Sequence, residues 1–211
     1  MNYAYRECYL NDAMRNLGEM TEYAHDACNI NPEKALRYFV ISGYANRFEQ
    51  GDPGVVCGLS GTELLQRASE KCGEVKEWPP AIVKYSTEEY YWIGYILAYF
   101  QWSINRSFGS ILDTVSPDDL LNMYPALHTA SEERAVSSIA DLYRNRTQAG
   151  RLQEYRKRMA MTQAELAKVS RVNIRTLQQY EAGSKSINKA AAETVIALAY
   201  ALHCRPEELI S

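Results

Sequence analysis

The chain has 211 residues, 46% of them hydrophobic, and a formal net charge of −3. This length suits one large or two modest domains, and the apolar content supports packed cores. The longest apolar run, residues 90–104, is too short to cross a bilayer as a helix and is interrupted by Gln101 and several tyrosines, which favours a buried helix over a membrane span. The polar start, MNYAYRECYLND, predicts no signal peptide.

The cysteine count favours a reducing environment. Five cysteines form an odd set without a CxxC pair or other metal-type spacing. We therefore expect reduced, mostly buried thiols in a cytoplasmic protein.

Apolar residues recur at three- and four-residue steps in the first part of the chain, which predicts helices. The first helix is expected over residues 5–27. Pro32 suits the first turn of the second helix, which ends near Gly43. The stretch GDPG at 51–54 predicts a turn.

Capping signals mark the next helix. Ser60 and Glu63 form a capping-box pattern before a helix that ends at Gly73. The double proline in EWPPAIVK, residues 77–84, cannot lie inside a helix, so this segment is expected to be a connector.

Four further helices are predicted after this connector. They are expected over about 87–105 (capped by Ser86 and Glu89), over 107–114, from Ser116 to before Pro125, and from Thr129 (capped with Glu132) to at least Tyr143. Only Gly150 interrupts the sequence between that helix and Arg151. The junction is therefore either a short hinge or a nearly continuous helix.

The 87–105 helix is apolar on nearly all sides, so it is expected to be central. The first 145 residues carry 13 of the 16 tyrosines and all three tryptophans, and these residue types favour interfaces. Two interpretations stay open: the aromatic residues are core, or some of them form a partner surface or a ligand pocket. The candidate partner surface consists of Tyr91, Trp92, Tyr95, Tyr99 and Trp102.

No catalytic constellation is recognisable. His25, His128 and His203 are isolated, and none stands at metal-ligand spacing. The stretch GLSGTE at 58–63 lacks the lysine of a phosphate loop, and a helix start explains it. We therefore expect no enzyme, no metal and no cofactor.

Residues 162–181 predict two short helices joined by a tight turn. Thr162 and Gln163 open the first helix, and Asn173 is a favourable N-cap for the second. The second helix buries Leu177 and Tyr180. It exposes Ile174, Arg175, Gln178 and Gln179. Arginine can bridge guanine O6 and N7, and glutamine can bridge adenine N6 and N7, so this face suits reading of the major groove.

The balance of charged residues changes sign between residues 145 and 146, a short distance before the two predicted helices. Residues 146–211 contain 11 Lys and Arg against 6 Asp and Glu, whereas residues 1–145 contain 12 against 20. A positive module suits phosphate binding, because each neutralised phosphate releases counterions. We expect two domains, 1–145 and 146–211.

Residues 151–210 resemble the lambda-repressor-like (Xre, Cro/CI-type) helix-turn-helix family, from LQEYRKRMAMTQAELA to YEAGSKSINKAAAETVIALAYALHCRPEELI. The resemblance implies a five-helix DNA-binding domain at the C-terminus. Together with the helical body that the residue spacing predicts, this makes the expected fold all-α. The resemblance implies a homodimer on a double-stranded operator, with paired half-sites about one helical turn apart. It also implies an ion pair between Arg156 and Glu181.

The resemblance assigns DNA contacts residue by residue. The base-reading set is Asn173, Ile174, Arg175, Gln178 and Gln179, and the phosphate set is Thr162, Gln163, Ser184, Lys185 and Asn188. One position departs from the family, which usually has glycine where this chain has Arg171. A left-handed conformation costs arginine about 1 kcal/mol, so a shifted turn is an open alternative.

The body is similar, more diffusely, to helical regions that precede such domains in bacterial toxin–antitoxin loci, in SGYANRFEQGDPGVVCGLSGTELL and EEYYWIGYILAYFQWSINRSF. This implies a type II antitoxin that neutralises a cognate toxin through residues 1–145 and represses its own operon. An acidic body rich in tyrosine would suit a cationic nucleotide- or RNA-handling toxin. Two alternatives are a ligand-sensing repressor with a small-molecule pocket in the body, and an enzymatic body tethered to DNA.

Overall fold

The computed structural model describes residues 3–74, 77–81 and 88–210, and every regular element within these ranges is helical. The all-α prediction is therefore confirmed. The chain forms two compact units, Met1–Ile139 and Ala140–Ser211. The boundary that we predicted, between residues 145 and 146, lies six residues further along the chain.

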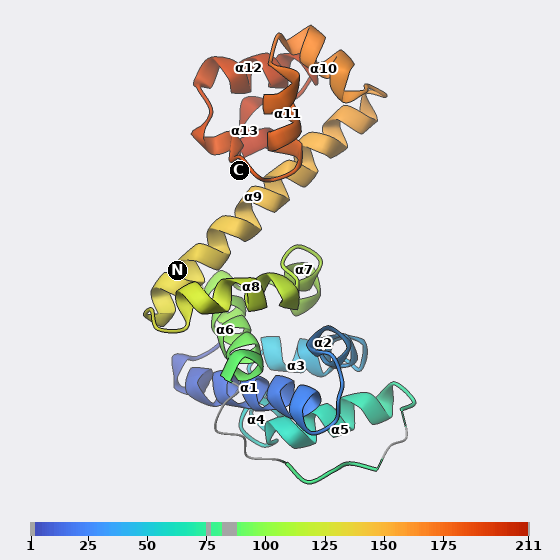
Figure 1. Ribbon diagram of the computed structural model, residues 1–211, viewed down its shortest axis with the longest axis vertical. Coiled ribbons are helices and arrows are strands. Elements are labelled where there is room, and N and C mark those ends of the chain that lie inside the picture. Colours follow the sequence, from blue (N-terminus) through green and yellow to red (C-terminus); the bar gives the residue numbers. More distant parts are fainter. Residues whose placement is uncertain (1–2, 75–76, 82–87, 211) are drawn as a thin grey trace. The chain divides into compact units, whose positions relative to one another are not determined.

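The first unit is built from short and medium helices (Figure 1). They are η1 (Glu7–Tyr9), α1 (Leu10–Asp26), α2 (Pro32–Ile41), α3 (Tyr44–Glu49), α4 (Pro53–Val56), α5 (Gly61–Lys71), α6 (Glu88–Ile104), α7 (Phe108–Leu112), α8 (Pro117–Leu127) and the first turns of α9 (Glu132–Arg158). The capping box at Ser60 and Glu63 is present, and Ser116 with Asp119 forms a second one at the start of α8.

Helix α1 is the centre of this unit, because it packs along α6 and also contacts α5 and α2. The packing of α1 on α6 depends on Gly94, where an added Cβ would lie 2.1 Å from the carbonyl oxygen of Leu17. Close to this crossing, the buried hydroxyl of Thr21 donates a hydrogen bond of 2.7 Å to the carbonyl of Tyr90. Helix α6 is therefore central, as its all-round apolar sequence predicts.

Several expected element boundaries are wrong. The first helix begins at Leu10 after η1 rather than near residue 5, and α3 lies where no helix was expected. Helix α8 continues through Pro125 to Leu127, because proline removes only one hydrogen bond and the next turn closes through the His128 N–H and the Tyr124 carbonyl. Helix α9 begins after Ser131 rather than Thr129, and the Ser131 hydroxyl accepts from the Arg134 N–H. The GDPG turn leads directly into the short helix α4.

Two expectations concern residues that lie wholly or partly outside the described ranges. The cap at Ser86 lies outside the described residues, as do residues 82–84 of the predicted connector. Its residues 77–81 form no regular element, as the double proline predicts.

All five cysteines are present as thiols, but the expectation that most are buried is wrong. Only Cys28 is buried, whereas Cys72 and Cys204 are half-buried and Cys8 and Cys57 are exposed. The four others lie in a short 3-10 helix, at helix ends or just beyond one, rather than on the inner face of a long helix.

The second unit consists of the last turns of α9, then α10 (Gln163–Ser170), α11 (Ile174–Glu181), η2 (Ile187–Lys189), α12 (Ala192–Ala201) and α13 (Pro206–Ile210). Its core joins all of these elements, through Leu152, Leu166, Leu177, Tyr180, Ile187, Val195, Leu198, Leu202 and Leu209. Figure 1 shows α10 to α13 gathered around the last turns of α9. Helix α9 runs without a break through Gly150, which settles the choice between a hinge and a continuous helix at that residue.

None of the helices in the described part of the chain has the length and apolarity that a bilayer crossing needs.

Candidate nucleic-acid interface

Helix α10 begins with a complete capping box. The Thr162 hydroxyl accepts from the Glu165 N–H at 3.2 Å, and the Glu165 carboxylate accepts from the Thr162 N–H at 2.7 Å. The Thr162 N–H, followed by the Thr162 hydroxyl, which also donates to this carboxylate, holds the pKa of Glu165 below its ordinary value. Leu166 and Ala167 are buried on the opposite side of the helix, so the first turn of α10 stays at the surface.

The turn after α10 keeps the register that the sequence predicts. Arg171 adopts the left-handed conformation, with φ 57° and ψ 21°, so the turn is not shifted. Asn173 then caps α11, since its side-chain oxygen accepts from the Arg175 N–H at 2.9 Å.

Helix α11 separates a buried face from a polar exposed face. Leu177 is fully buried and Tyr180 is 4% exposed. Four of the five predicted base-reading residues are exposed: Asn173, Arg175, Gln178 and Gln179. The fifth, Ile174, is half-buried and packs against the core of the unit. The structure thus gathers three amide side chains and one guanidinium on a single surface.

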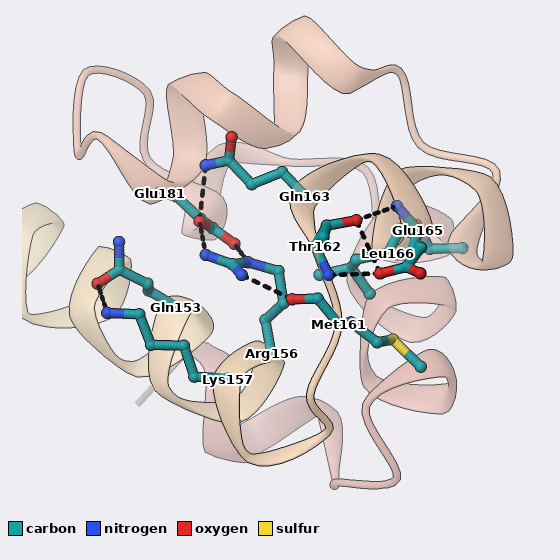
Figure 2. A network of polar contacts seen from close by, with 10 residues as sticks. Gln153, Arg156, Lys157, Met161, Thr162, Gln163, Glu165, Leu166 and Glu181 are labelled. Atoms are coloured by element: carbon teal, nitrogen blue, oxygen red, sulfur yellow. Dashed lines mark hydrogen bonds and ion pairs between the residues drawn. The ribbon is translucent and has the colours of Figure 1, made fainter.

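A buried polar network holds α11 in place. The Nε and Nη2 of Arg156 donate to the two carboxylate oxygens of Glu181 at 2.6 and 2.9 Å, which is the ion pair that the resemblance implies. Figure 2 shows Gln163 and Arg156 converging on this carboxylate, and the Gln163 amide nitrogen donates to it at 2.8 Å. The hydrogen bond to Glu181 raises the pKa of Arg156. The side chain of Glu181 is only 1% exposed, so the network belongs to the fold.

Three of the candidate phosphate contacts already have protein partners. The Thr162 hydroxyl donates to the Glu165 carboxylate at 2.7 Å. The Gln163 amide nitrogen gives one hydrogen to Glu181, so one hydrogen and the backbone N–H remain for an anion at the helix N-terminus. The Ser184 hydroxyl donates to the Gln179 carbonyl at 3.2 Å. A phosphate contact by Ser184 would therefore compete with this bond.

The loop after α11 presents the remaining candidates. Gly183 is left-handed, with φ 69°, and directs the chain into exposed Ser184 and Lys185. The Lys185 ammonium lies 5.5 Å from the ring centroid of Tyr180, and Asn188 is exposed in η2. The candidate phosphate contacts thus come from the segment before α11 in the sequence and from the segment after it.

Sequence reasoning missed two features of this surface. The Arg156 guanidinium also donates to the carbonyl of Met161 at 2.7 Å, which ties the loop before α10 to the network. Lys189 is a further exposed cation in η2, next to Asn188. The resemblance contained no signal for the first, whereas the charge of the segment could have indicated the second.

The model of the helix-turn-helix family matches residues 152–209. The C-terminal unit is a helix-turn-helix domain of the lambda-repressor-like kind. The predicted family resemblance of this region is therefore confirmed, and α10 and α11 are the two helices that give the domain its name. Such domains bind DNA, so the chain is a DNA-binding transcriptional regulator. The searches of curated proteins and of solved structures found no match to this chain.

The aromatic residues proposed as a partner surface separate into two groups. Trp102 is 4% exposed, its indole N–H donates to the Tyr5 carbonyl at 2.8 Å, and Tyr3 stacks on its ring, so it belongs to the core of the first unit. Its assignment to a surface is therefore wrong. Tyr91, Trp92, Tyr95 and Tyr99 are half-buried on α6.

The half-buried tyrosines of α6 lie beside carboxylates. The Tyr95 hydroxyl donates to the Glu132 carboxylate, and the Tyr91 and Tyr95 rings stack. Burial, followed by the charges of Glu133 and Glu132, raises the pKa of Tyr99. This part of the first unit is aromatic and acidic at once.

Proposed function

We propose that this regulator binds a double-stranded operator as a homodimer, with α11 of each subunit in the major groove. The observation that carries the proposal is the polar face of α11, where Asn173, Arg175, Gln178 and Gln179 are exposed while Leu177 and Tyr180 are buried. An eight-residue helix contacts only a few base pairs, so two subunits on paired half-sites would supply the specificity that one lacks.

The base-edge chemistry of this face is defined by its side chains. A guanidinium favours guanine through O6 and N7, and the amides of Gln178 and Gln179 favour adenine through N6 and N7. Ile174 is half-buried, and its exposed part offers an apolar contact of the type that a thymine methyl group uses. The half-site should therefore contain purines on the strand that α11 reads.

Phosphate contacts would fix the domain on the duplex. The candidates are Thr162, Gln163, Ser184, Lys185 and Asn188. The positive balance of residues 146–211 supports this role, since backbone phosphates supply most of the affinity that does not depend on sequence.

We further propose that the first unit binds and neutralises a toxin encoded beside this gene, so that the protein is a type II antitoxin that represses its own operon. The excess of acidic residues in this part of the chain, and the tyrosines of α6 beside Glu132 and Glu133, support a cationic protein partner. Tyrosine gives large contact area and a polar tip, which suits an interface.

The two parts of the proposal are tested with one variant of the full chain. Footprinting of the region upstream of the gene should show two protected half-sites, and Arg175→Ala should remove the protection. The same variant should still rescue growth when the neighbouring gene is expressed, because the toxin would bind the other unit. Loss of rescue together with loss of protection would contradict the assignment of the two roles to separate units.

A ligand-sensing repressor is the second candidate, and two hollows in the first unit favour it. One, of about 320 Å³, lies between α2 and the α7–α8 segment and is lined by Arg37, Val40, Ile41, Leu112 and Asp113 among others. The other, of about 270 Å³, contains His25 stacked on Tyr90. Both are near the lower limit for small-molecule sites. If a metabolite rather than a toxin is the effector, it should change operator affinity and raise thermal stability together.

A further inference from the structure

Arg171 is an exposed cation in the turn that leads into α11. Asn173, which caps that helix, follows two residues later. Two residues span at most about 7 Å, so the Arg171 backbone lies close to the N-terminal end of the reading face. In helix-turn-helix domains the N-terminal residues of this helix contact base edges, which places the turn near the edge of the groove.

The guanidinium of Arg171 has no partner among the described residues of the chain. It makes no hydrogen bond, ion pair or ring contact there. Two other exposed cations of the second unit are paired, Arg158 with Glu154 and Arg205 with Glu208. A free, exposed guanidinium is available for an anion from outside the chain.

The backbone conformation of Arg171 gives this residue an unusual cost. Its φ of 57° is in the region that favours glycine and asparagine. Ala160 and His203 in the same unit are also left-handed, so the conformation alone assigns no role. Arg171 differs from both because it combines the conformation with a long cationic side chain directly before the reading helix.

We propose that Arg171 binds a backbone phosphate beside the point where α11 enters the major groove. The contact would be additional to those of the related domains, which usually have glycine at this position and thus no side chain to make it. This inference rests on the proposed placement of α11 in DNA. It assigns Arg171 to anchoring rather than to base reading.

The test is the salt dependence of DNA binding by the full-length protein, with a duplex from the region upstream of its gene and a random duplex of equal length. Replacing Arg171 by Gly should weaken binding to both duplexes and reduce the slope of log K against log salt by about 0.9, the value for one phosphate contact. The same variant should unfold at no lower denaturant concentration than the wild type, because glycine adopts the conformation without strain. A structural role would instead lower stability and leave the slope unchanged.

Three further variants make the result specific. Arg171→Lys should keep the wild-type slope, because it keeps the charge. Arg171→Asn should reduce the slope as Arg171→Gly does, because it removes the charge, while asparagine tolerates the left-handed conformation. Arg205→Gln removes an ion-paired cation of the same unit and should leave the slope unchanged. An unchanged slope for both Arg171→Gly and Arg171→Asn would overturn the inference.

Parallel measurement of Arg175→Ala separates this inference from the proposed function. If Arg175→Ala weakens operator binding selectively while Arg171→Gly leaves the slope unchanged, α11 reads DNA without help from Arg171. If Arg175→Ala changes neither duplex, the placement of α11 itself is wrong, and the inference fails with it.

Discussion

Removal of the Glu181 carboxylate should strongly destabilise the helix-turn-helix domain. Glu181 is 1% exposed at its side chain and accepts three hydrogen bonds, two from Arg156 and one from Gln163. Glu181→Ala leaves the Arg156 guanidinium, which is 11% exposed, as a positive charge without its counter-ion. Breaking a buried pair by removing one partner costs about 3–5 kcal/mol.

The structure indicates the lower end of this range. Arg156 retains its hydrogen bond to the Met161 carbonyl at 2.7 Å, and part of its side chain can reach water. We therefore expect Glu181→Ala to lower the free energy of unfolding of the second unit by about 3 kcal/mol. A unit of this size has a total stability of about 4–11 kcal/mol, so the variant should lose between about a quarter and three quarters of the stability of the unit.

Urea unfolding can follow the two units with different probes. All three tryptophans, Trp78, Trp92 and Trp102, belong to the first unit, so tryptophan fluorescence reports on that unit. Far-UV circular dichroism reports on helix in both. The expected result is an early loss of part of the helical signal, while the fluorescence midpoint stays close to that of the wild type.

Glu154→Ala is the matched control. It removes an ion pair of the same 2.6 Å distance, to Arg158, but both side chains are more than half exposed. Such surface pairs contribute about 0.5 kcal/mol. Equal and small shifts for the two variants would refute the argument that burial sets the cost. In addition, Arg156→Met combined with Glu181→Leu should recover part of the lost stability, because no unpaired charge remains.

Three further results are expected. Arg175→Ala should cost about 1–3 kcal/mol on the operator and relax the preference at one base pair, as measured by binding to a panel of single-base operator variants; equal losses on operator and random DNA would contradict a base-reading role. Lys185→Ala should weaken binding to all sequences alike and reduce the salt slope by about one, and an unchanged slope would remove Lys185 from the phosphate set. Gly94→Ala should disrupt the first unit, because its Cβ would meet the Leu17 carbonyl at 2.1 Å. Gly150→Ala has no neighbour within 4 Å of its Cβ and should stabilise α9 by about 0.5–1 kcal/mol. Similar denaturation midpoints for these two variants would count against the close packing of α1 on α6.

The helices and the reading face were predictable from local patterns. The capping boxes at Ser60 and Thr162 and the cap at Asn173 depend on residues at most three positions apart. The buried side of α11 follows from a periodicity of the same length. The same local rules failed at Pro125 and Thr129, where a helix tolerated one missing hydrogen bond and where a nearer hydroxyl, that of Ser131, made the cap.

Local patterns could not predict which polar and aromatic side chains are already occupied. The sequence predicts Gln163 as a phosphate ligand, but in the structure its amide donates to Glu181, which is 18 residues away in the chain. The sequence also allows Trp102 on a partner surface, but in the structure its indole N–H donates to the Tyr5 carbonyl, which is 97 residues away in the chain. The order of polar and apolar residues along the chain was thus enough for the elements and for the face that α11 exposes, because these depend on neighbours within one or two turns. The availability of each side chain on that face depends on partners brought close by folding, and their approach is set by packing that no short stretch of sequence contains.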